Sequence, residues 1–118
     1  MKEKLKNWRD QYVVWHANTY PIPTFEESRL IRKKVWFYGR VQNVGFRLET
    51  QHLAKRIGLI GSVQNLDEGC VYAELQGTSE QIQFLIKCMK TLRRAAVKHV
   101  WIEDDEVDED AVEFIVIK

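Results

Sequence analysis

The stretch from residue 39 to residue 47, Gly-Arg-Val-Gln-Asn-Val-Gly-Phe-Arg, constrains the fold of this chain more than any other segment. A β-rich run, residues 34–38, enters it, and a helix-compatible run, residues 48–57, leaves it. Where a strand turns through small residues into a helix, free backbone N–H groups and the helix dipole favour an anion. Arg47, at the helix start, adds a planar guanidinium suited to phosphate. The segment therefore predicts an anion-binding corner, with phosphate as the first candidate.

From residue 33 onward, strand and helix signals follow one another regularly. Thr78 reads as a helix N-cap, Gly58 as a left-handed helix end, and Asp67-Glu68-Gly69 as a hairpin turn. The expected strands are 34–39, 62–66, 70–76, 97–102 and 112–117, the last two separated by an acidic loop, and the expected helices are 46–57 and one after Thr78. This order, β-α-β-β-α-β plus a terminal strand, predicts an α+β, ferredoxin-like sandwich. Two helices would cover one face of a mostly antiparallel sheet.

The first 32 residues differ from the rest, which suggests an N-terminal helical extension (1–32) before a second domain (33–118). An aromatic and apolar stripe predicts one helix in this segment. The stripe is expected to pack against its own domain or a partner subunit, so the protein would be a monomer or a weak homodimer. Pro21 and Pro23 then interrupt the chain, and Thr24 with Glu27 reads as a capping box opening a short helix through about Arg32. The stripe consists of Leu5, Trp8, Tyr12 and Trp15.

Composition and charge narrow the class of protein. With 118 residues, 45% hydrophobic and 30% charged, the chain is typical of one soluble globular protein, without a membrane span or a signal peptide. Cys70 and Cys88 show no metal or redox spacing, so a cytoplasmic protein with reduced thiols packed as small apolar residues is expected. Residues 1–34 carry eight Lys or Arg against four Asp or Glu, and residues 95–118 carry two against eight. Both charge runs are interpreted first as solvated surface.

The motifs of residues 39–77 resemble the acylphosphatase family. The family's signature is close to G-R-V-Q-G-V-x-F-R, and residues 39–47 match it at seven of eight defined positions. The resemblance covers residues 33–118. Later positions that match are Ala54, Gly58, Leu59, Gly61, Val63, Asn65, Gly69, Val71 and Gly77.

The resemblance implies a hydrolase that cleaves an acyl phosphate to a carboxylate and inorganic phosphate by direct attack of water. It implies no metal, no cofactor and no phosphoenzyme, and His16, His52 and His99 lie in separate elements without ligand spacing. By the same resemblance Arg47 and Asn65 are catalytic, Arg47 gripping the phosphate and Asn65 orienting the water. The phosphate-binding residues implied are Gln42, Asn43, Val44, Gly45, Phe46 and Arg47.

Two positions depart from the family pattern, and two other functions stay open. Asn43 replaces a glycine, but asparagine tolerates left-handed backbone angles, so the loop is expected to keep its shape. Ser62 replaces a tryptophan before Val63.

One alternative function is a catalytically weakened module that binds phosphate or a phosphoprotein. The other is a nucleic-acid module using residues 32–34 and Trp36, which ranks last because the sheet lacks the RNA-recognition signature.

Overall fold

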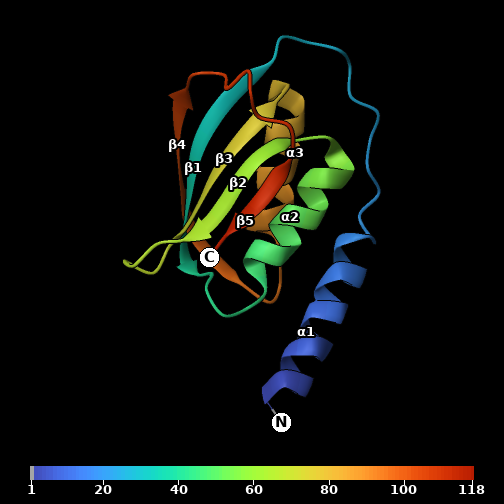
Figure 1. The fold of residues 1–118 in the computed structure, drawn as a ribbon, viewed down its shortest axis with the longest axis vertical. Coiled ribbons are helices and arrows are strands. Elements are labelled where there is room, and N and C mark those ends of the chain that lie inside the picture. The colour runs from blue at the N-terminus through green and yellow to red at the C-terminus, as the bar shows by residue number, and fades with distance from the viewer. Residues whose placement is uncertain (1) are drawn as a thin grey trace.

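The computed structural model describes the backbone of residues 2–118 and the side chains of residues 6–118. Three helices and five strands follow one another along the chain, with α1 standing apart from the sheet beside α2 (Figure 1). None of the described helices combines the length and apolar character required for a membrane span. The elements are α1 (Lys2–Ala17), β1 (Ile31–Arg40), α2 (Phe46–Ile57), β2 (Ile60–Asn65), β3 (Val71–Gly77), α3 (Ser79–Lys90), β4 (Ala96–Asp105) and β5 (Phe114–Ile117).

The five strands form one mixed sheet in the order β4-β1-β3-β2-β5. The neighbours β4-β1, β1-β3 and β3-β2 are antiparallel, whereas β5 runs parallel to β2. Helices α2 and α3 lie on the same side of this sheet (Figure 1). The predicted ferredoxin-like sandwich with a terminal strand is therefore confirmed.

The hydrophobic core fills the space between the sheet and the two helices, and it includes the apolar faces of α2 and α3. Phe37 of β1 and Phe46 of α2 meet edge to face, with ring centroids 5.1 Å apart. Cys70 and Cys88 are free and buried, as predicted, and burial raises the pKa of both thiols. Buried thiols of raised pKa stay protonated and behave as small apolar groups.

The predicted helix ends are confirmed by their backbone geometry. Gly58 closes α2 in the left-handed conformation, with φ 98°, and its N–H donates to the Ala54 carbonyl. Thr78 opens α3 with a capping box, in which its side chain accepts from the Gln81 N–H and the Gln81 side chain accepts from the Thr78 N–H. Both signals depend only on neighbouring residues, so tertiary packing does not override them.

Helix α1 forms as predicted, but the first expected place for its aromatic stripe, packed on its own domain, is wrong, and packing on a partner subunit stays a prediction. Trp8 is 69% exposed and Trp15 is 61% exposed, whereas Val13 and Ala17, one turn apart on another face, are fully buried. Small and branched side chains allow the close approach that α1 makes to its neighbours. The side chain of Leu5, the fourth member of the stripe, lies outside the described residues.

Two further predictions about local structure are wrong. The short helix expected from the Thr24 capping box is absent, since residues 21–30 have no regular structure and Ile31 already pairs with β3. The expected acidic loop is partly strand, because β4 continues to Asp105. There Asp104 and Asp105 pair with Lys33 and Arg32 of β1. In both places pairing between distant segments outweighs the local preference.

Candidate active site

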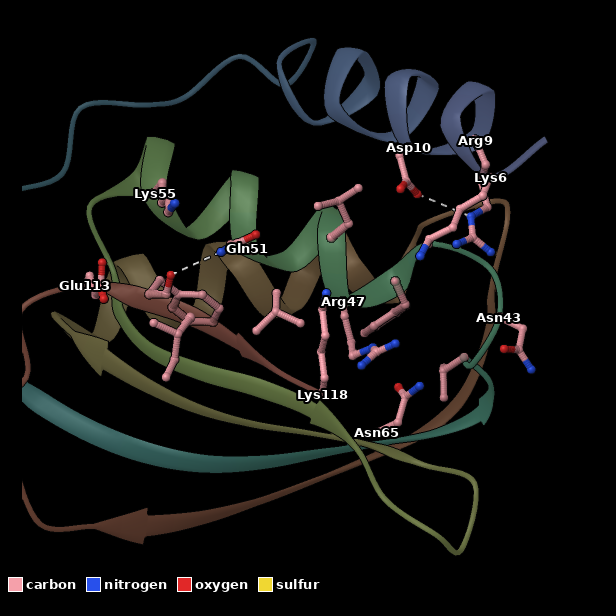
Figure 2. Close-up of a pocket in the computed structure, with 17 residues that line it drawn as sticks. Lys6, Arg9, Asp10, Asn43, Arg47, Gln51, Lys55, Asn65, Glu113 and Lys118 are labelled. Carbon is pink, nitrogen blue, oxygen red and sulfur yellow. Dashed lines mark hydrogen bonds and ion pairs between the residues drawn. The ribbon is translucent and has the colours of Figure 1, made fainter. Parts of the chain in front are cut away.

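Residues 41–45, the 41–45 loop, connect β1 to α2 and set the shape of the site. Asn43 has φ 63°, so the prediction that asparagine keeps the left-handed geometry is confirmed. Its side chain points away from Arg47 and Asn65 (Figure 2). Gly45, the N-cap of α2, also has positive φ, 76°, and a Cβ there would lie 2.6 Å from Val13 Cγ2. Glycine at this position therefore permits both the turn and the close approach of α1.

The Gln42 side chain fixes the 41–45 loop to the β2–β3 hairpin. Its Nε2 atom donates to the carbonyl oxygens of Leu66 at 2.8 Å and Cys70 at 3.0 Å. The family resemblance implied only phosphate binding for Gln42, and no sequence signal pointed to this contact. The two hydrogen bonds therefore connect the loop to the hairpin that directly follows Asn65, the last residue of β2.

Arg47 and Asn65 face the same cavity from two different elements (Figure 2). Arg47 lies in the first turn of α2, and its Nη1 donates to the Ile117 carbonyl of β5 at 3.3 Å. The Asn65 Oδ1 atom is buried and has no hydrogen-bond partner among the described residues. A buried acceptor without a partner is rare in folded proteins, so it calls for a ligand or water at this point.

The cavity has a volume of about 560 Å³ and a predominantly basic wall. Among the predicted site residues it is lined by Asn43, Gly45, Phe46, Arg47 and Asn65, while Gln42 and Val44 lie in the loop without lining it. Sequence reasoning missed the contribution of α1, although the basic excess of residues 1–34 was visible. The charged side chains of the wall are Lys6, Arg9, Arg47, Lys55 and Lys118, against Asp10 and Glu113.

A buried carboxylate supports the other side of the 41–45 loop. The Glu49 side chain has no exposed surface, and it accepts from Arg94 Nη2 at 2.6 Å and lies 3.1 Å from His16 Nδ1 of α1. Arg94 Nε in turn donates to the Val44 carbonyl at 3.1 Å. Burial, followed by the negative charge of Glu49, raises the pKa of Tyr20 to about 12, so Tyr20 is neutral beside this cluster. No sequence motif pointed to these contacts.

Metal-ligating side chains do not gather in the part of the chain whose side chains are described. Within it, no group of three or more His, Cys, Asp or Glu residues is close enough to hold an ion. The groups that converge on the cavity are instead amide and guanidinium donors and one amide oxygen. Such donors can bind an anion and orient a small polar molecule beside it.

The fold is a two-layer α+β sandwich in which the Arg47 guanidinium of a strand–loop–helix corner and the Asn65 amide of β2 face one basic cavity. The family model described as Acylphosphatase matches residues 33–116. The chain therefore belongs to the acylphosphatase family. The predictions of the family and of an acylphosphatase-type hydrolase are confirmed.

Individual relatives agree with the family assignment. The acylphosphatase of Picrophilus torridus is 39% identical over 71 residues, which cover 60% of this chain and 85% of that protein. The crystal structure of acylphosphatase from Bacillus subtilis superposes with a TM-score of 0.70 at 26% identity, covering 76% of this chain and all of that one. The acylphosphatase structure from Coxiella burnetii gives a TM-score of 0.70 at 31% identity, covering 80% and 100%.

Proposed function

We propose that this protein hydrolyses an acyl phosphate to a carboxylate and inorganic phosphate by direct attack of a water molecule, without a metal or a phosphoenzyme. The observation that carries the proposal is the unpartnered Asn65 Oδ1 atom in the same cavity as the Arg47 guanidinium. The reaction requires little acid–base chemistry, because the carboxylate of a mixed anhydride is a good leaving group. Positioning and charge stabilisation of the transferring phosphoryl group then supply most of the catalysis.

Arg47 and the 41–45 loop hold the phosphoryl group in this proposal. A guanidinium presents two parallel N–H donors to phosphate oxygens and does not shuttle protons. The backbone N–H groups of residues 42–46 lie at the start of α2, where the helix dipole adds partial positive charge. Negative charge on the equatorial oxygens is thereby stabilised without an added cation.

Asn65 positions the nucleophile in this proposal. Its Oδ1 atom accepts a hydrogen bond from the attacking water, and its amide donates to a phosphoryl oxygen or to the same water. The Gln42 contacts to Leu66 and Cys70 keep the hairpin, and with it Asn65, at a fixed distance from the loop. The water is oriented without being deprotonated in advance.

Particular features of the structure argue against the two competing functions. In the weakened phosphate-binding module Asn43 would impair turnover, but its side chain points away from Arg47 and Asn65, and its φ of 63° keeps the left-handed turn (Figure 2). The nucleic-acid module depends on the basic residues 32–34, but Arg32 is buried against Glu74 and Asp105, and Lys33 pairs with Asp104. A cytoplasmic location and a monomer or weak homodimer stay predictions.

Phosphate release from benzoyl phosphate tests the proposal. The purified protein, assayed in excess chelator, is expected to release phosphate at the same rate as without chelator. Inorganic phosphate is expected to inhibit competitively, because product and substrate bind at the same place, between Arg47 and the 41–45 loop. Activity lost with the chelator and restored by a divalent ion would contradict the metal-free mechanism. Phosphate binding by calorimetry without turnover would favour the binding module.

A further inference from the structure

Helix α1 forms part of the wall of the cavity that contains Arg47 and Asn65. Lys6, Arg9 and Asp10 line this cavity, and Figure 2 shows the Lys6 and Arg9 side chains reaching from α1 toward the start of α2. The family match begins only at residue 33, so these side chains lie outside the matched segment. The N-terminal segment therefore adds charge to a site that the matched segment already contains.

Specific contacts hold α1 at this place. Val13 is fully buried against Gly45 of the 41–45 loop, and His16 contacts the buried Glu49 carboxylate. At the end of the helix, Arg56 Nη1 donates to the carbonyls of Ala17 at 2.9 Å and Tyr20 at 2.8 Å. Because α1 is anchored to α2 and to the loop, Lys6 and Arg9 occupy a defined position relative to Arg47.

The cavity has room for more than one phosphoryl group, and its charged wall extends to α1. A volume of about 560 Å³ lies within the 300–1,000 Å³ range of pockets for drug-sized ligands. Arg47 and the loop amides already supply the donors for one phosphoryl group. At the α1 end of the cavity, Lys6 has no ion-pair partner among the described side chains, and Arg9 pairs with Asp10 at 3.5 Å. Lys6, Arg9 and Asp10 together carry one net positive charge.

We propose that Lys6 and Arg9 form a second anion subsite that binds a carboxylate on the acyl part of the substrate. The preferred substrate is then an acyl phosphate of a dicarboxylic acid. One net positive charge matches a singly charged carboxylate better than a doubly charged phosphate group. The inference rests on the proposed acylphosphatase function, and it assigns the N-terminal helix to substrate selection.

The test compares kcat/KM for 4-carboxybenzoyl phosphate and 4-methylbenzoyl phosphate, which have similar shapes and differ by one charge. The wild-type protein is expected to prefer the carboxylated substrate by about fivefold to tenfold, the scale of one or two exposed ion pairs. The preference is expected to reside in KM, and to decrease with added salt. In the double variant Lys6→Gln, Arg9→Gln the ratio should fall to about one.

A charge-matched control variant is Arg29→Gln, Lys90→Gln, which removes two exposed cations that do not line the cavity and should keep the wild-type ratio. Lys6→Glu should shift the preference toward the cationic 4-(aminomethyl)benzoyl phosphate. A wild-type ratio near one, or an unchanged ratio in the Lys6, Arg9 variant, would overturn the subsite. Absence of hydrolysis of every substrate would instead refute the proposed function, and the subsite with it.

Discussion

The Arg94 guanidinium lies 2.6 Å from the Glu49 carboxylate, although the Glu49 side chain has no exposed surface. The two residues are 45 positions apart in the sequence, and Arg94 also donates to the Val44 carbonyl of the 41–45 loop. The pair therefore joins the loop, the first turn of α2 and the segment between α3 and β4. A buried carboxylate in such a pair depends on its partner for compensation of its charge.

Arg94→Met should lower the free energy of unfolding by about 3 kcal/mol, the lower end of the range for breaking a buried ion pair. The lower end applies because the Arg94 side chain is 21% exposed. Urea unfolding measures the change, and Arg93→Met, an exposed neighbour, serves as the control with little expected effect. The double variant Glu49→Leu, Arg94→Met should recover part of the loss, since no buried charge is left unpaired. An Arg94→Met protein as stable as wild type would contradict this role of the pair.

Arg47→Ala should strongly weaken both phosphate binding and turnover. Loss of a bidentate charged contact costs roughly 2–5 kcal/mol, so kcat/KM with benzoyl phosphate should fall by at least about 30-fold. Arg47→Lys should rescue poorly, because an ammonium cannot reproduce the two parallel donors. Arg40→Ala is a matched control, since Arg40 is exposed, adjacent to the loop and not part of the cavity wall. Near wild-type kinetics for the lysine variant would show that Arg47 is not the clamp.

Asn65→Ala should separate turnover from binding. The value of kcat is expected to fall by about 10²–10³, as when one preorganised hydrogen-bonding group is removed, while the inhibition constant of inorganic phosphate stays near wild type. Asn65→Asp should not restore activity, because it places a negative charge beside the phosphoryl oxygens. Circular dichroism checks the fold, since Asn65 directly precedes the hairpin turn. Full turnover in Asn65→Ala would disprove the water-orienting role.

Substitutions at Asn43 should report on backbone conformation, not on side-chain chemistry. Asn43→Gly should keep kcat/KM and phosphate affinity within about twofold of wild type, because glycine adopts φ 63° without cost. Asn43→Val should weaken both, since a branched side chain in the left-handed region costs about 1–2 kcal/mol. Steady-state kinetics and calorimetry with phosphate measure the two effects. Equal behaviour of the two variants would mean that the loop tolerates another backbone shape.

The parts of the structure that sequence predicted are those encoded by neighbouring residues. The turn from β1 into α2, the left-handed Gly58 and the Thr78 capping box each depend on a few adjacent positions. The site residues Arg47 and Asn65 were predicted from the resemblance of two separate motifs to the acylphosphatase family, and the structure brings both residues to one cavity. Their catalytic roles stay predictions until the variants are measured.

The parts that sequence did not predict depend on partners far along the chain. Nothing near Glu49 shows that its carboxylate will be buried, because Arg94 and His16 arrive from other elements. Hydrophobicity favoured the aromatic residues of α1 as the packed face, yet the contact with Gly45 requires a smaller side chain, Val13. In the same way, the helix signal at Thr24 is not realised, because residues 21–30 have no regular structure and Ile31 already pairs with Gly77 of β3.

From the parallel pairing of β5 with β2 we expect the gain of activity during refolding to be a late event. Arg47 is held by the carbonyl of Ile117, 70 residues away, and residues 114–116 wall the cavity. Closing so long a loop is slow compared with forming the local β1–α2 turn. A partly folded chain can thus contain the 41–45 loop and still lack a complete active site. Recovery of hydrolysis after dilution from denaturant would follow the docking of β5 itself.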